Sequence, residues 1–202
     1  KLCVAESLPL LTKGDPRVLT VGPNTFEVVA LVENPNADAN ISRAHYTLKL
    51  YTPDSLVPVK TIEGMTYVPN GDTFVVFEGP FVLEGGSAPN RVILEWDQAS
   101  LVWKKTSSIA MPTVGEKNLS RTNSSPRLEV SINNSSLESI SNIDLTALLY
   151  DSAGSIFAAS KTFVDTIPAG GSAQAIFTWP RALRAVPVEV QVIPTVIPEG
   201  GF

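Results

Sequence analysis

The sequence of 202 residues has few of the side chains on which most catalytic and metal sites depend. It contains one cysteine, Cys3, and one histidine, His45. A single cysteine excludes a disulfide within the chain, and a single histidine excludes a multi-histidine metal site. We expect His45 to be a surface or edge residue of a strand. Cys3 is expected to be a leftover thiol, with a disulfide to another chain or to a cysteine upstream of Lys1 as the alternative.

Charged residues and long apolar runs are also scarce. Only 17% of the residues are charged and the formal net charge is −5, so we do not expect nucleic acid to be a partner. No stretch approaches the roughly 18 uninterrupted apolar residues of a membrane helix. The first residues also lack the charged start, apolar core and cleavage site of a signal peptide. If the protein is exported, we therefore expect its export segment to precede Lys1.

What the sequence does have is period-two alternation of apolar and polar residues. Examples are "RLEVSIN" (127–133), "DLTALLYD" (144–151) and "PVEVQVI" (187–193), whereas no amphipathic helical stripe of useful length is found. Turn clusters lie between these segments and use most of the 16 prolines and 13 glycines. The pattern predicts an all-β fold of half-buried antiparallel strands.

The order of strands and turns occurs twice, at a distance of about 99 residues. In both copies an asparagine-rich turn precedes an alternating strand that ends in Leu-Tyr, and a hairpin and a Pro-Gly turn follow. A period of this length is that of a whole domain. We therefore predict two tandem immunoglobulin-like antiparallel β-sandwich domains related by internal duplication, spanning residues 1–105 and 106–202. The residues matched on this alignment are Asn34 with Asn133, Tyr51 with Tyr150, Pro69 with Pro168 and, after one inserted residue, Phe77 with Phe177.

The segments "LKLYTPD" (48–54) and "ALLYDSAG" (147–154) resemble the motif of the FxLYD domain. Leu48 and Ala147 stand where that family has phenylalanine, and Thr52 stands where the first copy would have the aspartate. The resemblance implies a bacterial or archaeal extracytoplasmic β-sandwich, related in shape to late-embryogenesis-abundant-like and immunoglobulin-like folds. It brings no catalytic or cofactor residue. The motif positions are Leu48, Leu50 and Tyr51 in the first copy and Ala147, Leu149, Tyr150 and Asp151 in the second.

A second resemblance is to surface proteins of uncultured small-celled bacteria, which carry an "ENPN" turn in the first of two such sandwiches. Here the turn is Glu33-Asn34-Pro35-Asn36. In those proteins a transmembrane helix and a cysteine- and glycine-rich segment precede the sandwiches. The resemblance implies that this chain is the cell-surface part of a protein whose membrane anchor precedes Lys1, and that "KLC" is the end of the cysteine-rich segment.

Two kinds of side chain remain as candidates for binding. The three tryptophans, Trp96, Trp103 and Trp179, suit a sugar-stacking platform, although we favour core packing for Trp96 and Trp179. Several aspartates lie in turns, where the carboxylate usually bonds its own backbone, and no D-x-D-x-D calcium loop is present. A calcium ion at an interdomain turn stays open as an alternative. The turn aspartates are Asp38, Asp54, Asp72, Asp151 and Asp165.

The sequence favours a protein without enzymatic activity and without a cofactor. Our leading hypothesis is an extracytoplasmic structural or interaction module of the cell envelope that contacts other proteins, including copies of itself. A specific form is a subunit of a surface filament, pilus or surface layer, joined by pairing of edge strands. The alternative is a carbohydrate-binding or adhesion module, which needs at least two exposed aromatic rings on one face. An enzyme would need an acidic cleft with paired carboxylates.

Overall fold

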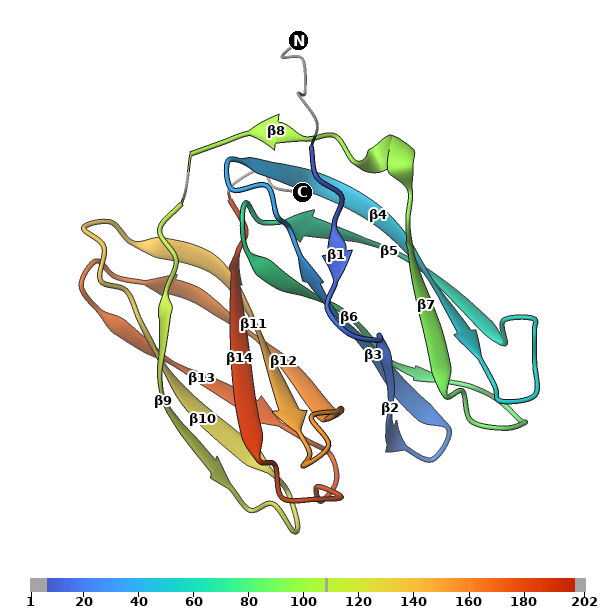
Figure 1. Cartoon of the computed structure of the whole chain (residues 1–202). Coiled ribbons are helices and arrows are strands. Elements are labelled where there is room, and N and C mark those ends of the chain that lie inside the picture. Colours follow the sequence, from blue (N-terminus) through green and yellow to red (C-terminus); the bar gives the residue numbers. More distant parts are fainter. Residues whose placement is uncertain (1–6, 108, 199–202) are drawn as a thin grey trace. The chain divides into compact units, whose positions relative to one another are not determined.

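The computed structural model of the chain describes residues 7–107 and 109–198 (Figure 1). Within these residues the regular elements are β-strands and one short 3-10 helix, η1 (Gln98–Ser100). The strands pair in antiparallel sheets, so the fold is all-β, as the alternating pattern predicted. No helix in the described part of the chain has the length and apolar character needed to span a membrane.

The described strands form four sheets, and the chain divides into two compact units. The first unit contains residues 7–18, 27–107 and 109, and the second contains residues 19–26 and 110–198. The arrangement is consistent with two β-sandwich domains.

The sheets of the first half of the chain enclose an apolar core. In one sheet β3 (Thr25–Glu33) pairs with β1 (Leu11–Thr12), β2 (Arg17–Gly22) and β6 (Thr73–Val82). In the other, β4 (Ala39–Tyr51) lies between β5 (Lys60–Val68) and β7 (Arg91–Trp96), and β8 (Lys104–Lys105) pairs with the start of β4. Burial of the apolar side chains between the two sheets is the main contribution to the stability of this unit. Core residues from both sheets include Val28, Val32, Ile41, Leu48, Leu50 and Phe74.

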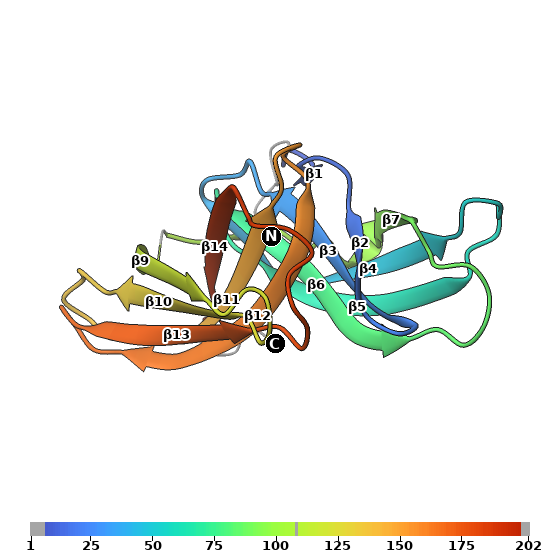
Figure 2. The ribbon, with the colours of Figure 1, turned by 90° about the horizontal axis from the view of Figure 1, so that it is seen from below.

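The second half repeats this construction. In one sheet β10 (Arg127–Asn133) runs between β9 (Thr113–Ser120) and β13 (Ser172–Thr178), as Figures 1 and 2 show. In the other, β11 (Ile140–Tyr150) pairs with β12 (Ile156–Ile167) and β14 (Glu189–Val196). The core of this half includes apolar side chains from β10, β11 and β13 that are almost completely buried, among them Leu128, Val130, Ile132, Leu145, Leu149 and Phe177.

One buried asparagine in each unit corrects the alignment made from the sequence. Asn34 and Asn134 are both buried and both hold the turn that follows a central strand, whereas Asn133 is half-buried at the end of β10. Asn134, and not Asn133, is therefore the counterpart of Asn34. The sequence could not distinguish two adjacent asparagines in the same turn.

The match between Phe77 and Phe177 is also wrong. The backbone N–H of Asn34 donates to the carbonyl of Asp72, and that of Asn134 donates to the carbonyl of Gly171. The strands that follow, β6 and β13, therefore start at equivalent positions. Counted from Thr73 and Ser172, the first residues of these strands, Phe177 corresponds to Glu78. Phe77 is one position away and therefore faces the opposite side of its sheet.

Candidate functional site

The recurring motif lies at the end of the central strand of one sheet in each unit. Four of its apolar residues are fully buried in the cores, and Tyr51 is nearly so. Tyr150 is half-buried. The motif therefore serves mainly to build the sheet. The four fully buried residues are Leu48, Leu50, Ala147 and Leu149.

Both motif tyrosines have structural partners. The Arg91 guanidinium lies over the Tyr51 ring, 4.4 Å from its centroid, which is a cation–π contact. The hydroxyl of Tyr150 donates to Oε1 of Gln191 on β14 at 2.8 Å. Burial, and secondarily the charge of Glu189, raise the pKa of Tyr150. A phenol held in its neutral form in this way is not prepared to act as a nucleophile or base.

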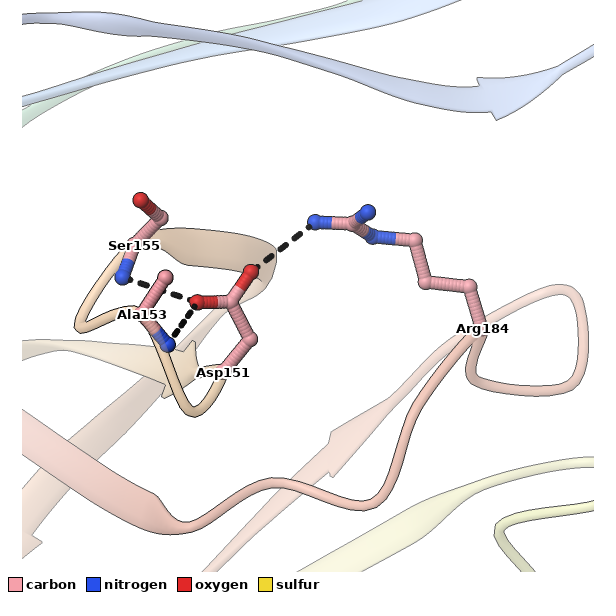
Figure 3. Close-up of polar contacts among 4 residues, drawn as sticks. All are labelled: Asp151, Ala153, Ser155 and Arg184. Atoms are coloured by element: carbon pink, nitrogen blue, oxygen red, sulfur yellow. Dashed lines mark hydrogen bonds and ion pairs between the residues drawn. The ribbon is translucent and has the colours of Figure 1, made fainter.

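Asp151 organises the tight turn between β11 and β12 (Figure 3). Its Oδ1 accepts hydrogen bonds from the backbone N–H groups of Ala153 and Ser155, each at 3.0 Å. Its Oδ2 lies 3.4 Å from Nη2 of Arg184, in the connection between β13 and β14. Gly154 takes a positive φ of 71° in this turn, a conformation that glycine adopts without strain. Both carboxylate oxygens are occupied, so the carboxylate holds the turn.

The first copy has Thr52 at the position of Asp151 and holds the corresponding connection by other hydrogen bonds. The carbonyl of Thr52 accepts from the backbone N–H of Ser55 at 3.3 Å, and Ser55 Oγ donates to the carbonyl of Val57 at 2.7 Å. The resulting connection is longer, since β5 does not begin until Lys60. The aspartate of the motif therefore has a role in the second unit alone.

Each unit exposes a Val-Pro-Val segment beside its motif. In the first unit the N–H of Val59 donates to the carbonyl of Leu50 at 2.8 Å, and in the second the N–H of Val188 donates to the carbonyl of Tyr150 at 2.9 Å. Figure 1 shows the first segment in the loop between β4 and β5. The exposed fractions are 94% for Leu56, 71% for Val57, 45% for Val59, 79% for Val186 and 67% for Val188.

The "ENPN" turn is a network of asparagine side chains. Asn34 Nδ2 donates to the carbonyls of Ala39 at 2.8 Å and Pro69 at 2.7 Å, and its Oδ1 accepts from the backbone and side-chain nitrogens of Asn36. Asn36 in turn binds the backbone of Leu8 on both sides, through an N–H to Oδ1 contact of 2.8 Å and an Nδ2 to O contact of 2.9 Å. The turn thus attaches the segment that precedes β1 to the first unit.

The tryptophans are found in two different environments. Trp179 is buried, with 6% of its surface exposed, as predicted. Trp96 is half-buried and packs edge-on against Tyr46, with ring centroids 5.8 Å apart. Trp96 and the half-buried Trp103 line one pocket of about 290 Å³ in the first unit, together with residues 7–10, Gln98 and Leu101. A platform of all three tryptophans, as considered from the sequence, is therefore not formed.

The remaining candidates from the sequence do not come together. His45 is exposed on β4, as predicted. Asp72 Oδ1 accepts from the N–H of Thr73, Asp38 pairs with Lys105 at 3.5 Å, and Asp54 lies in a turn, as predicted. The prediction for Asp165 is wrong, because this residue lies within β12 and not in a turn. In the described part of the chain no three histidine, cysteine, aspartate or glutamate side chains group as a metal site would require. Cys3 lies outside the described residues.

No protein-family model matches the chain, and no curated protein matches it. The resemblance to the FxLYD domain therefore stays a prediction.

The structure adds functional candidates that the sequence analysis did not single out. The hydrogen bonds between Asn36 and Leu8 join residues 28 positions apart, and the Trp96–Trp103 pocket is assembled from two separate segments, residues 7–10 and 96–103. The exposed Val-Pro-Val segments could have been noticed in the sequence. "LVPVK" (56–60) and "AVPVE" (185–189) place apolar residues in connections that are otherwise rich in polar residues.

Proposed function

We propose that the chain is a non-enzymatic, extracytoplasmic module of the cell envelope that makes structural contacts with other proteins, including copies of itself. In this proposal the two units are immunoglobulin-like sandwiches that arose by duplication. The cell-surface location is supported by the resemblance of the motif and of the "ENPN" turn to surface proteins.

One observation carries the proposal: the polar groups of the motif are used in hydrogen bonds within their own unit, while apolar side chains next to the motif are exposed to solvent. Asp151 and Tyr150 hold a turn and a strand. Beside them, Val186 and Val188 are largely in contact with solvent, as are Leu56 and Val57 in the other unit. Clusters of exposed apolar side chains at loop tips are typical of surfaces that bind another protein.

Proline makes these segments suitable for recognition. A Val-Pro-Val segment has a restricted backbone, so less conformational entropy is lost when a partner binds it. Each segment is also held by the backbone hydrogen bond to its motif strand. The contact surface is thus prepared before binding.

The proposal is tested by the solution mass of the chain over a wide concentration range, together with electron microscopy of concentrated samples. We expect the mass to rise with concentration, and we expect the double substitutions L56S/V57S and V186S/V188S to weaken this association. L137S is the matched control, because Leu137 is 96% exposed but lies in a different loop, after Asn134. A chain that stays monomeric at every concentration would contradict self-assembly, and equal association in all variants would contradict the role of the Val-Pro-Val segments.

A further inference from the structure

The pocket between Trp96 and Trp103 has the composition of a binding site for a neutral ligand. No charged residue lines it; the lining consists of two tryptophans, leucine and proline residues, Gln98 and Ser7. Its volume of about 290 Å³ lies at the lower end of the range of small-molecule pockets. This size suits one ring and not an extended chain.

Ring contacts and hydrogen bonds hold the walls of the pocket in place. Trp96 is fixed by the edge-on contact with Tyr46 and by the tilted ring of Phe74, whose centroid is 6.3 Å away. The other lining segment, residues 7–10, is held by the two hydrogen bonds between Asn36 and the backbone of Leu8. A pocket with fixed walls loses little entropy when it binds a ligand.

Gln98 supplies polar groups that are still available. It is exposed in η1, and its side-chain amide makes no hydrogen bond with the described residues. An amide offers both donors and an acceptor, and neighbouring hydroxyl groups of a sugar need both. The indole faces would contact the C–H face of the same ring.

We propose that this pocket binds a neutral pyranose ring, with Trp96 and Trp103 contacting its apolar face and Gln98 hydrogen-bonding its hydroxyls. The site lies in the first unit only and uses none of the Val-Pro-Val residues. The inference is therefore independent of the proposed protein contacts.

The test uses the full chain and a panel of neutral sugars: glucose, galactose, mannose and N-acetylglucosamine. Binding is followed by backbone and indole N–H chemical shifts during titration. We expect at least one sugar to shift the indole signals of Trp96 and Trp103 but not that of the buried Trp179. We also expect W103A and Q98L to weaken binding by roughly tenfold or more, since each removes one kind of contact.

Two control variants test whether a loss of sugar binding comes from the pocket itself, and not from misfolding or from the Val-Pro-Val segments. V102S changes a residue that is 61% exposed and adjacent to Trp103 but does not line the pocket, so it should bind sugar as the wild type does. L56S/V57S should also leave sugar binding unchanged. The proposal is overturned if no sugar of the panel shifts the indole signals, or if W103A and Q98L bind as well as V102S.

Discussion

The first unit packs a polar pair where the second packs two hydrocarbon side chains. In the first unit the hydroxyl of Tyr46 donates to Oε1 of Glu78 at 2.6 Å. At the corresponding positions the second unit has Leu145 and Phe177, both almost completely buried. Burial, and then the hydrogen bond to Glu78, raise the pKa of Tyr46. Exchanging both partners of a buried polar pair for apolar groups is nearly neutral, whereas exchanging one of them is costly.

The residue across from Tyr46 leaves room for its large ring. Gly64 lies directly across from it on β5, and a Cβ at that position would collide with the tyrosine ring. In the second unit the residue across from Leu145 is Thr162. Tyr46 and Gly64 in the first unit thus stand where the second unit has Leu145 and Thr162.

The asparagine turns show what is shared and what is not. Asn134 donates to the carbonyls of Glu138, Ile167 and Pro168, as Asn34 donates to those of Ala39 and Pro69. The next-but-one residue differs: Asn36 reaches Leu8, while the Ser136 hydroxyl bonds only within its own turn, to Asn134 and Glu138. The buried asparagine is therefore the shared element, and the attachment of the preceding segment belongs to the first unit.

Removal of the buried asparagines should have the largest effect. We expect N34A and N134A each to lower the free energy of unfolding of their own unit by about 3 kcal/mol, because several buried backbone groups lose their partners. Hydrogen exchange read by mass spectrometry reports on the two units separately in the same chain.

N133A is the control that decides the alignment of the two units. Asn133 is half-buried, and its Oδ1 accepts only from Ser131 Oγ at 3.2 Å among its side-chain contacts, so we expect a loss of less than about 1 kcal/mol. If N133A cost as much as N134A, the alignment of Asn34 with Asn133 made from the sequence would be restored.

Substitutions in the two motif turns should have smaller and unequal effects on the free energy of unfolding. D151A removes the acceptor for two backbone N–H groups, and we expect the second unit to lose about 1–2 kcal/mol. R184A should cost less than about 0.5 kcal/mol, because the Arg184 side chain is 66% exposed and an exposed ion pair contributes little. T52A is the matched change in the first unit and should have little effect. Urea unfolding of the three variants checks this order, and R184A matching D151A would contradict it.

The sequence predicted the fold class well because alternation reports directly on which side chains face a core. "RLEVSIN" is a strand with Leu128, Val130 and Ile132 buried, as its pattern required. The match between the two copies failed by one residue at Asn134 and at Phe177, because a one-residue shift leaves composition and turn signals almost unchanged. Only the backbone hydrogen bonds of the asparagine turn set the register.

The candidate sites were less predictable than the fold. The motif residues Leu48 and Leu149 could be assigned to the core from their alternation, but the tryptophan pocket depends on contacts between distant segments. Nothing in the local pattern of "LEWDQASLVW" (94–103) shows that residues 7–10 lie against it. Contacts between segments so far apart in the sequence leave no local pattern by which they could be predicted.

A further effect depends on pH and distinguishes β3 from β10. Glu27 on β3 has a buried Oε2 without a hydrogen-bond partner among the described residues, and burial raises its pKa from 4.5 to about 7. Its counterpart on β10 is Arg127, whose Nε pairs with Glu129 at 2.7 Å. The folded chain therefore keeps Glu27 protonated between pH 4.5 and 7, whereas the unfolded chain ionises it.

The sign of the pH effect follows from this difference. Because the folded-state pKa is the higher one, Glu27 has no effect on stability below the unfolded pKa and becomes increasingly destabilising up to about pH 7. We expect E27Q to match the wild type at pH 4 and to be more stable by about 1 kcal/mol at pH 8, a reduced figure because the side chain still contacts water. R127Q should not change the slope over this range. Urea unfolding at several pH values measures both variants, and parallel curves for E27Q and the wild type would show that Glu27 is solvated in the folded chain.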